Sequence, residues 1–206
     1  MGALEIPLIK DAAYTAIRFE GTPVPSCLAL DIQARGHIDA TRTIYVGTFS
    51  KTIAPGLRVG WLCAARDLID KVVLTKQAAD LHAPSLNQIL IHHFASTEYD
   101  HLIPRVVTLY RARRDAMLAA LETHMPPGVT WTRPQGGMFT WLTLPAHMDA
   151  TALLPSAFEE YRIAYVPGAA FHPDSAGRNT LRLNYSLQPE PMIAEGMARL
   201  GSLLRL

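Results

Sequence analysis

One lysine of this chain is surrounded by side chains that suit a phosphorylated aldehyde. Lys51 follows the β-branched and aromatic run 43–47, which predicts a buried strand, and the hydroxyls of Thr48 and Ser50 flank it. Arg58 comes seven residues later. An amine can form a Schiff base with an aldehyde, hydroxyls can donate to phosphate oxygens, and an arginine offers a planar fork to the same dianion. The segment therefore indicates a site for a cofactor that is both an aldehyde and a phosphate ester.

The same segment carries a resemblance to a known family. Residues 47–61 read GTFSKTIAPGLRVGW and resemble the S-x-S-K-x-x-x-P-G-x-R-x-G segment of class I/II aminotransferases, fold-type-I enzymes that use pyridoxal 5'-phosphate. The resemblance implies that Lys51 is the catalytic lysine that holds the cofactor, and that Thr48, Ser50 and Arg58 hold its phosphate. Thr48 replaces the more usual serine and keeps the hydroxyl.

Two further elements extend this resemblance. Asp11 and Tyr14 match a D-x-x-Y element at the end of the preceding strand, where the carboxylate would pair with the pyridine nitrogen and the tyrosine would donate to the ring oxygen. Arg182 resembles the arginine of the R-x-N/S-x-S strand, which would clamp the substrate α-carboxylate. Since side chains alternate along a strand, Arg182 points away from the face shared by Leu181 and Leu183.

Three segments narrow the resemblance to the α-aminoadipate and kynurenine branch of the family. They are residues 76–88, 133–141 and 166–171, and we interpret them as packing features rather than catalytic ones. The branch implies transfer of an amino group from an α-amino acid, 2-aminoadipate-like or of broad specificity, to a 2-oxo acid, with 2-oxoglutarate the expected acceptor. Two alternatives stay open: an aminotransferase-like effector-binding module of a transcriptional regulator, and a catalytically silent truncated transaminase.

The hydrophobic pattern predicts two domains. Consecutive apolar runs at 6–9, 43–47 and 59–64 predict strands that are covered on both faces in a mostly parallel α/β sheet. Residues 1–98 would then be the remnant of the large cofactor-binding domain. Residues 99–206 would be a connecting helix and a small α+β domain. The expected helices are one capped by Asp67, then 85–95, 99–125, 150–161 and 190–206, and the expected strands of the small domain are 129–132, 138–144, 163–166 and 180–185.

Composition excludes several other classes of protein. With 206 residues, a net charge of +1 and 18% charged residues, the chain has no bulk charge for nucleic acid, and no apolar run approaches the roughly 20 residues of a membrane span. Two cysteines without C-x-x-C spacing favour a reduced, cytoplasmic setting. His82, His92 and His93 lack carboxylates at ligand spacing, so we expect no metal site.

The resemblance also implies that the family's N-terminal half is missing. The chain would then hold strands five, six and seven of a seven-stranded sheet and the whole small domain. Both edges of that remnant sheet would be bare, and bare apolar edges favour pairing with other chains. We therefore expect a homodimer or larger assembly.

Overall fold

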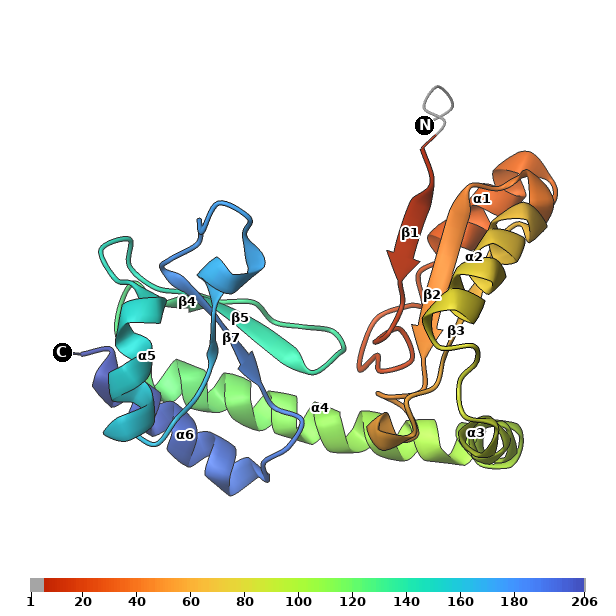
Figure 1. The fold of residues 1–206 in the computed structure, drawn as a ribbon. Helices are drawn as coiled ribbons and strands as arrows, with labels where there is room; N and C mark the ends of the chain where they lie inside the picture. The colour runs from red at the N-terminus through yellow and green to blue at the C-terminus, as the bar shows by residue number, and fades with distance from the viewer. Residues whose placement is uncertain (1–5, 206) are drawn as a thin grey trace. The chain divides into compact units, whose positions relative to one another are not determined.

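A computed structural model describes residues 6–205 of the chain, and Figure 1 shows its fold. The chain forms two compact units, the first ending at Val106 and the second beginning at Val107. The sequence placed this boundary between residues 98 and 99. The division instead lies inside helix α4 (Tyr99–His124), because Tyr99 lines a cavity together with residues of the first unit.

The first unit contains a three-stranded sheet in the order β1-β2-β3. β1 (Leu8–Asp11) runs parallel to β2 (Thr43–Thr48), whereas β3 (Gly60–Cys63) runs antiparallel to β2. The expected mostly parallel sheet is therefore wrong for β3. A parallel return requires a crossover of a dozen or more residues, and the short link here holds only the 3₁₀ turn η2 (Pro55–Leu57). The expected cover on both faces is also wrong for β1, where the side chain of Ile9 is 68% exposed.

Three helices accompany this sheet. α1 (Cys27–Arg35), which the sequence analysis did not predict, begins where the Ser26 hydroxyl accepts the Ala29 N–H and ends at Gly36, whose φ is +84°. α2 (Arg66–Ala79) has Ala65 at its N-cap, so Asp67 lies in the first turn and is not the predicted cap. α3 (Ser85–Thr97) extends two residues beyond its expected end at residue 95.

The second unit contains a four-stranded sheet in the order β4-β5-β7-β6. The neighbours β4 (Thr130–Trp131), β5 (Phe139–Thr143), β7 (Thr180–Asn184) and β6 (Val166–Pro167) all pair antiparallel. β6 is shorter than the expected strand at 163–166. The reason is that the Ile163 N–H donates to the Ala157 carbonyl at the end of α5, which removes it from the ladder.

Helices cover one face of this second sheet. α5 (Ala150–Glu159) is capped by the carboxylate of Asp149, and α6 (Glu190–Leu203) lies beside the C-terminal part of α4 (Figure 1). The inward side chains of β5 and β7 are Thr140, Leu142, Leu181 and Leu183, all buried. The alternate positions of both strands point to the opposite face, which is less covered. Among residues 6–205, no helix has both the length and the apolar character needed to cross a membrane.

Candidate active site

The parallel strand pair brings two predicted segments to one edge of the first sheet. β1 ends at Asp11, which is the register partner of Val46 near the end of β2. The Ala12 N–H continues the ladder by donating to the Val46 carbonyl at 2.9 Å. Since parallel strands finish at the same edge of a sheet, the Asp11 carboxylate lies at the edge where the Thr48–Lys51 segment leaves β2.

Directly after β2, two hydroxyls converge within a single turn. The oxygens of Thr48 and Ser50 are 3.0 Å apart, and the Ser50 backbone N–H donates to the Thr48 oxygen at 3.1 Å. The Thr48 hydroxyl also lies 3.3 Å from the carbonyl oxygen of Val59, to which it can donate. Both side chains are half-buried. This small polar cup can present hydroxyl donors to an oxyanion.

The Lys51 amine lies next to the ring of Tyr14. Its Nζ is 5.8 Å from the ring centroid, within the range of a cation–π contact. The Asp11 carboxylate accepts the Ala13 N–H at 3.0 Å and so closes the turn that leads to Tyr14. In the part of the chain that the structure describes, Lys51 makes no ion pair with a carboxylate. No carboxylate of the described chain therefore holds the amine.

Arg58 ends the loop that follows Lys51. Its backbone is left-handed, with φ +52° and ψ +40°, and its guanidinium donates to the Pro55 carbonyl at 3.3 Å. Within residues 6–205 no carboxylate pairs with this exposed guanidinium. Its remaining N–H groups are available to an anion, which fits the predicted phosphate role.

Tight packing holds the two strands that frame this segment. A Cβ added to Gly47 would lie 2.5 Å from the ring of Trp61, and that ring stacks on Tyr45 with centroids 5.3 Å apart. A cavity of about 410 Å³ opens beside the segment, with Thr52 and Tyr99 among its lining residues. Burial raises the pKa of the Tyr99 hydroxyl, so this wall of the cavity stays uncharged near neutral pH.

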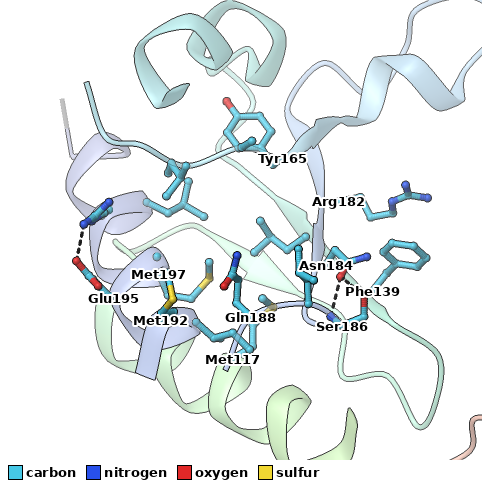
Figure 2. A pocket seen from close by; sticks show the side chains of 18 of the residues that line it. Met117, Phe139, Tyr165, Arg182, Asn184, Ser186, Gln188, Met192, Glu195 and Met197 are labelled. Atoms are coloured by element: carbon cyan, nitrogen blue, oxygen red, sulfur yellow. Dashed lines mark hydrogen bonds and ion pairs between the residues drawn. The ribbon is translucent and has the colours of Figure 1, made fainter. Parts of the chain in front are cut away.

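Arg182 lies in the second unit, at the centre of β7. Its register partners are Trp141 on β5 and Val166 on β6, and it is half-buried. The guanidinium carbon lies 4.0 Å from the ring centroid of Phe139 and 4.6 Å from that of Phe171. Figure 2 shows Arg182 beside Phe139. Over the described residues, Arg182 makes neither a hydrogen bond nor an ion pair, so its donors are open to a ligand.

Its sequence neighbour Arg178 has a structural role. Arg178 donates to the Asp149 carboxylate at 2.9 Å, and the same carboxylate caps α5. Arg178 thus lies before the start of β7 and already has a carboxylate partner, whereas Arg182 has none among the described residues. No three histidine, cysteine or acidic side chains of residues 6–205 are grouped so that they could hold a metal ion.

The second unit also contains a cavity with a different lining. It measures about 810 Å³ and lies between α6 and the end of β7, where Met192, Met197 and Gln188 line it (Figure 2). Arg182 is also a lining residue, but its side chain points away from the α6 methionines in this view. No lysine lines the cavity, so it cannot attach an aldehyde cofactor covalently.

Two aromatic neighbours of Arg182 were not among the predicted site residues. Phe139 and Phe171 belong to segments that the sequence analysis interpreted as packing features. Their contact with Arg182 depends on the register of β5 and β6 against β7. The alternation of apolar and polar residues along 138–144 could have assigned Phe139 to one face of its strand. It does not show how β5 pairs with β7, and this pairing brings Phe139 to Arg182.

Comparisons with known proteins identify the family. A family model described as aminotransferase class I and II matches residues 3–200. Aromatic-amino-acid aminotransferase 1 of Thermococcus litoralis is 41% identical over 199 residues, which cover 96% of this chain and 46% of that protein. The 2-aminoadipate transaminase of Thermus thermophilus is 41% identical over 198 residues, which cover 96% of this chain and 49% of that protein. The chain thus spans about half the length of the curated relatives it matches.

A solved structure extends the comparison to the fold. The crystal structure of LysN, an α-aminoadipate aminotransferase from Thermus thermophilus complexed with N-(5'-phosphopyridoxyl)-L-leucine, superposes with a TM-score of 0.90 at 40% identity. The match covers 97% of this chain and 50% of that one. It confirms the predicted fold class, the C-terminal part of a fold-type-I pyridoxal-phosphate transferase. On the family match and this fold, the chain belongs to the class I and II aminotransferases.

Proposed function

We propose that this chain carries the lysine-bearing half of a pyridoxal-phosphate-dependent aminotransferase. The observation that supports it most is the grouping of polar side chains after one strand end. Lys51 and Arg58 have no carboxylate partner among residues 6–205, and the hydroxyl oxygens of Thr48 and Ser50 lie 3.0 Å apart directly before Lys51 in the chain. A phosphorylated aldehyde needs an unpaired amine and several phosphate donors, so the residues present fit this cofactor.

Each side chain has a role in this proposal. The Lys51 amine would hold the cofactor aldehyde, and Thr48, Ser50 and Arg58 would donate to its phosphate. The Asp11 carboxylate would pair with the pyridine nitrogen, and Tyr14 would donate to the ring oxygen. When bound, pyridoxal phosphate supplies an electron sink for negative charge at the substrate α-carbon.

We propose a role toward the substrate for one cationic residue of each unit. The Arg182 guanidinium would bind the α-carboxylate through two parallel N–H donors. The Lys51 nitrogen would act as the general base that takes the proton from the α-carbon.

The relatives direct the choice of substrates. One is named a 2-aminoadipate transaminase and another an aromatic-amino-acid aminotransferase, so we propose α-amino acids of this range as donors. We propose 2-oxoglutarate as the acceptor and a homodimer as the assembly. The chain spans about half the length of these relatives, so an activity assay must use this chain and not a full-length relative.

Selective chemistry at Lys51 provides the test. After incubation with pyridoxal phosphate and reduction by borohydride, mass spectrometry should find the label on Lys51 and not on Lys10, Lys71 or Lys76. The Lys51→Ala variant should lose the label, and Lys71→Ala, on exposed α2, should keep it. Even labelling of all four lysines would contradict the assignment.

An assay with 2-aminoadipate and 2-oxoglutarate, in which the glutamate produced is measured, tests for aminotransferase activity. Selective labelling without turnover would instead favour the effector-binding alternative or a catalytically silent chain.

A further inference from the structure

Arg182 stands among three aromatic rings that come from two separate segments. Phe139 and Trp141 lie on β5, and Phe171 ends the 3₁₀ turn η3 (Gly168–Phe171). Trp141 is the register partner of Arg182, so the two side chains project from the same face of the sheet. Trp141 also meets the edge of Phe171, with ring centroids 5.3 Å apart and planes at 67°. The rings form a connected set around one guanidinium.

Gly168 allows Phe171 to reach this position. A Cβ on Gly168 would lie 1.8 Å from the Thr180 side-chain oxygen and 2.8 Å from the Gly177 carbonyl oxygen. No side chain fits there, so only glycine lets η3 pack this closely against the start of β7. No residue of segments 133–141 and 166–171 has a role in the proposed cofactor site. Each segment nevertheless places an aromatic ring against Arg182.

The contacts of Arg182 are unusual for a half-buried arginine. Within the described chain it has no carboxylate and no carbonyl partner, and its contacts are with the faces of Phe139 and Phe171. A ring over a guanidinium attracts the cation through its quadrupole and limits the rotation of the side chain. The N–H donors lie in the guanidinium plane, so stacking leaves them available along its edge.

We propose that Phe139 and Phe171, the latter backed by Trp141, are positioning residues that hold the edge of the Arg182 guanidinium ready for a planar carboxylate. This inference rests on the carboxylate role proposed for Arg182. In this proposal two uncharged rings hold the guanidinium, and no acidic side chain of the described chain pairs with it. A carboxylate ligand can therefore bind without displacing an acidic side chain.

The first measurement needs no ligand. In protein labelled with ¹⁵N-arginine, the Nε–Hε signal of Arg182, assigned by its loss in Arg182→Lys, should lie upfield because of ring currents. Phe139→Leu and Phe171→Leu should each move it towards the position of an unstacked arginine. Phe158→Leu is the matched control, since Phe158 is an exposed phenylalanine on α5 without a contact to Arg182.

The second measurement titrates L-2-aminoadipate into the same samples. We expect each leucine variant at 139 or 171 to bind about two- to thirtyfold more weakly, the range that a cation–π contact accounts for. Phe139→Tyr and Phe171→Tyr, which keep a ring, should restore both the signal position and the affinity. Thermal unfolding checks each variant's fold, and Phe171, 45% exposed, provides a second site if Phe139→Leu does not fold.

The two hypotheses fail in different ways. If Arg182→Lys abolishes binding while both leucine variants keep the wild-type signal and affinity, the positioning role is wrong and the carboxylate role stands. If Arg182→Lys leaves the affinity unchanged, the proposed role of Arg182 is wrong and the positioning role is overturned with it.

Discussion

The Thr48 hydroxyl organises the end of β2, and we propose it as a donor to the cofactor phosphate. It accepts the Ser50 N–H and lies within hydrogen-bond distance of the Ser50 hydroxyl and the Val59 carbonyl. We expect Thr48→Val, which keeps the shape and loses the oxygen, to weaken pyridoxal-phosphate binding about tenfold or more, since a hydrogen bond to a charged group contributes about 1.5–3 kcal/mol. Thr48→Ser should bind as the wild type does. Titration followed by cofactor absorbance measures the affinity.

The control for this variant is Thr75→Val on α2. The Thr75 hydroxyl donates only to the Lys71 carbonyl of its own helix, so its loss should leave cofactor affinity unchanged. Equal affinities for the Thr48 and Thr75 variants would contradict the phosphate role of Thr48.

The residues proposed around Lys51 could be grouped from sequence because they are almost contiguous. Thr48, Ser50, Lys51 and Arg58 lie within one strand end and one loop, so the local pattern alone groups them. The surroundings of Arg182 could not be predicted in the same way. Phe139 and Phe171 reach it only through strand pairing between distant segments, and pairing register is not written in any single segment.

At the scale of elements, the end of α4 lies close to Gly201 of α6. A Cβ on Gly201 would lie 2.2 Å from the His124 carbonyl oxygen. We expect Gly201→Ala to destabilise the protein by about 1–3 kcal/mol through overpacking. Gly196→Ala, on the same helix with open space around it, should stabilise by up to about 1 kcal/mol through helix propensity. Urea unfolding compares the two, and equal effects would contradict the close approach.

A second element contact predicts a dependence on pH. The Asp31 carboxylate of α1 accepts the Arg42 N–H at 2.9 Å and both the N–H and hydroxyl of Thr43, so it ties α1 to the start of β2. These bonds, the Arg42 N–H foremost, lower the pKa of Asp31 below its ordinary value of 3.8. Because the pKa of Asp31 is lower in the folded than in the unfolded protein, the ionised carboxylate stabilises the fold at pH values above the unfolded-state pKa. This stabilisation is lost as the pH falls through the folded-state pKa.

Asp31→Asn should therefore destabilise the protein at neutral pH, and its difference from the wild type should shrink below about pH 4. Asp70→Asn, at an exposed α2 position that makes no hydrogen bond in the described chain, is the control. Chemical unfolding measured from acidic to neutral pH checks both. A difference between Asp31→Asn and the wild type that stayed constant with pH would refute this role.

Helices and strands could be predicted where a long apolar pattern defines them. They were predicted less well where contacts with distant parts of the chain determine their ends or direction. The long helix α4 follows its apolar pattern closely. α1 was not predicted because only Leu28 of its nine residues is buried, which leaves a weak apolar stripe, although Ser26 and Gly36 mark its two ends. β3 turned antiparallel because of the length of its connection, which the apolar run itself does not encode.

At the scale of the whole molecule, the first unit exposes many large apolar side chains. Ile9 on β1 is 68% exposed, and Leu86 and Ile89 on α3 are 67% and 64% exposed. In the described sheet β1 and β3 are both edges, so unpaired backbone groups accompany the apolar surface. Such a combination of edge and apolar face favours association with another chain.

We therefore predict that the isolated chain self-associates, and that the apolar face of α3 contributes to the contact. Ile89→Lys should raise the dissociation constant about tenfold or more, because it places a charge in an apolar interface. Ile9→Lys tests the β1 edge in the same way. Leu30→Lys is the control, since Leu30 is 51% exposed and lies on a different element, α1. Sedimentation velocity over a range of concentrations, with and without pyridoxal phosphate, provides the measurement; a wild-type chain that stays monomeric throughout would show that this surface needs no partner.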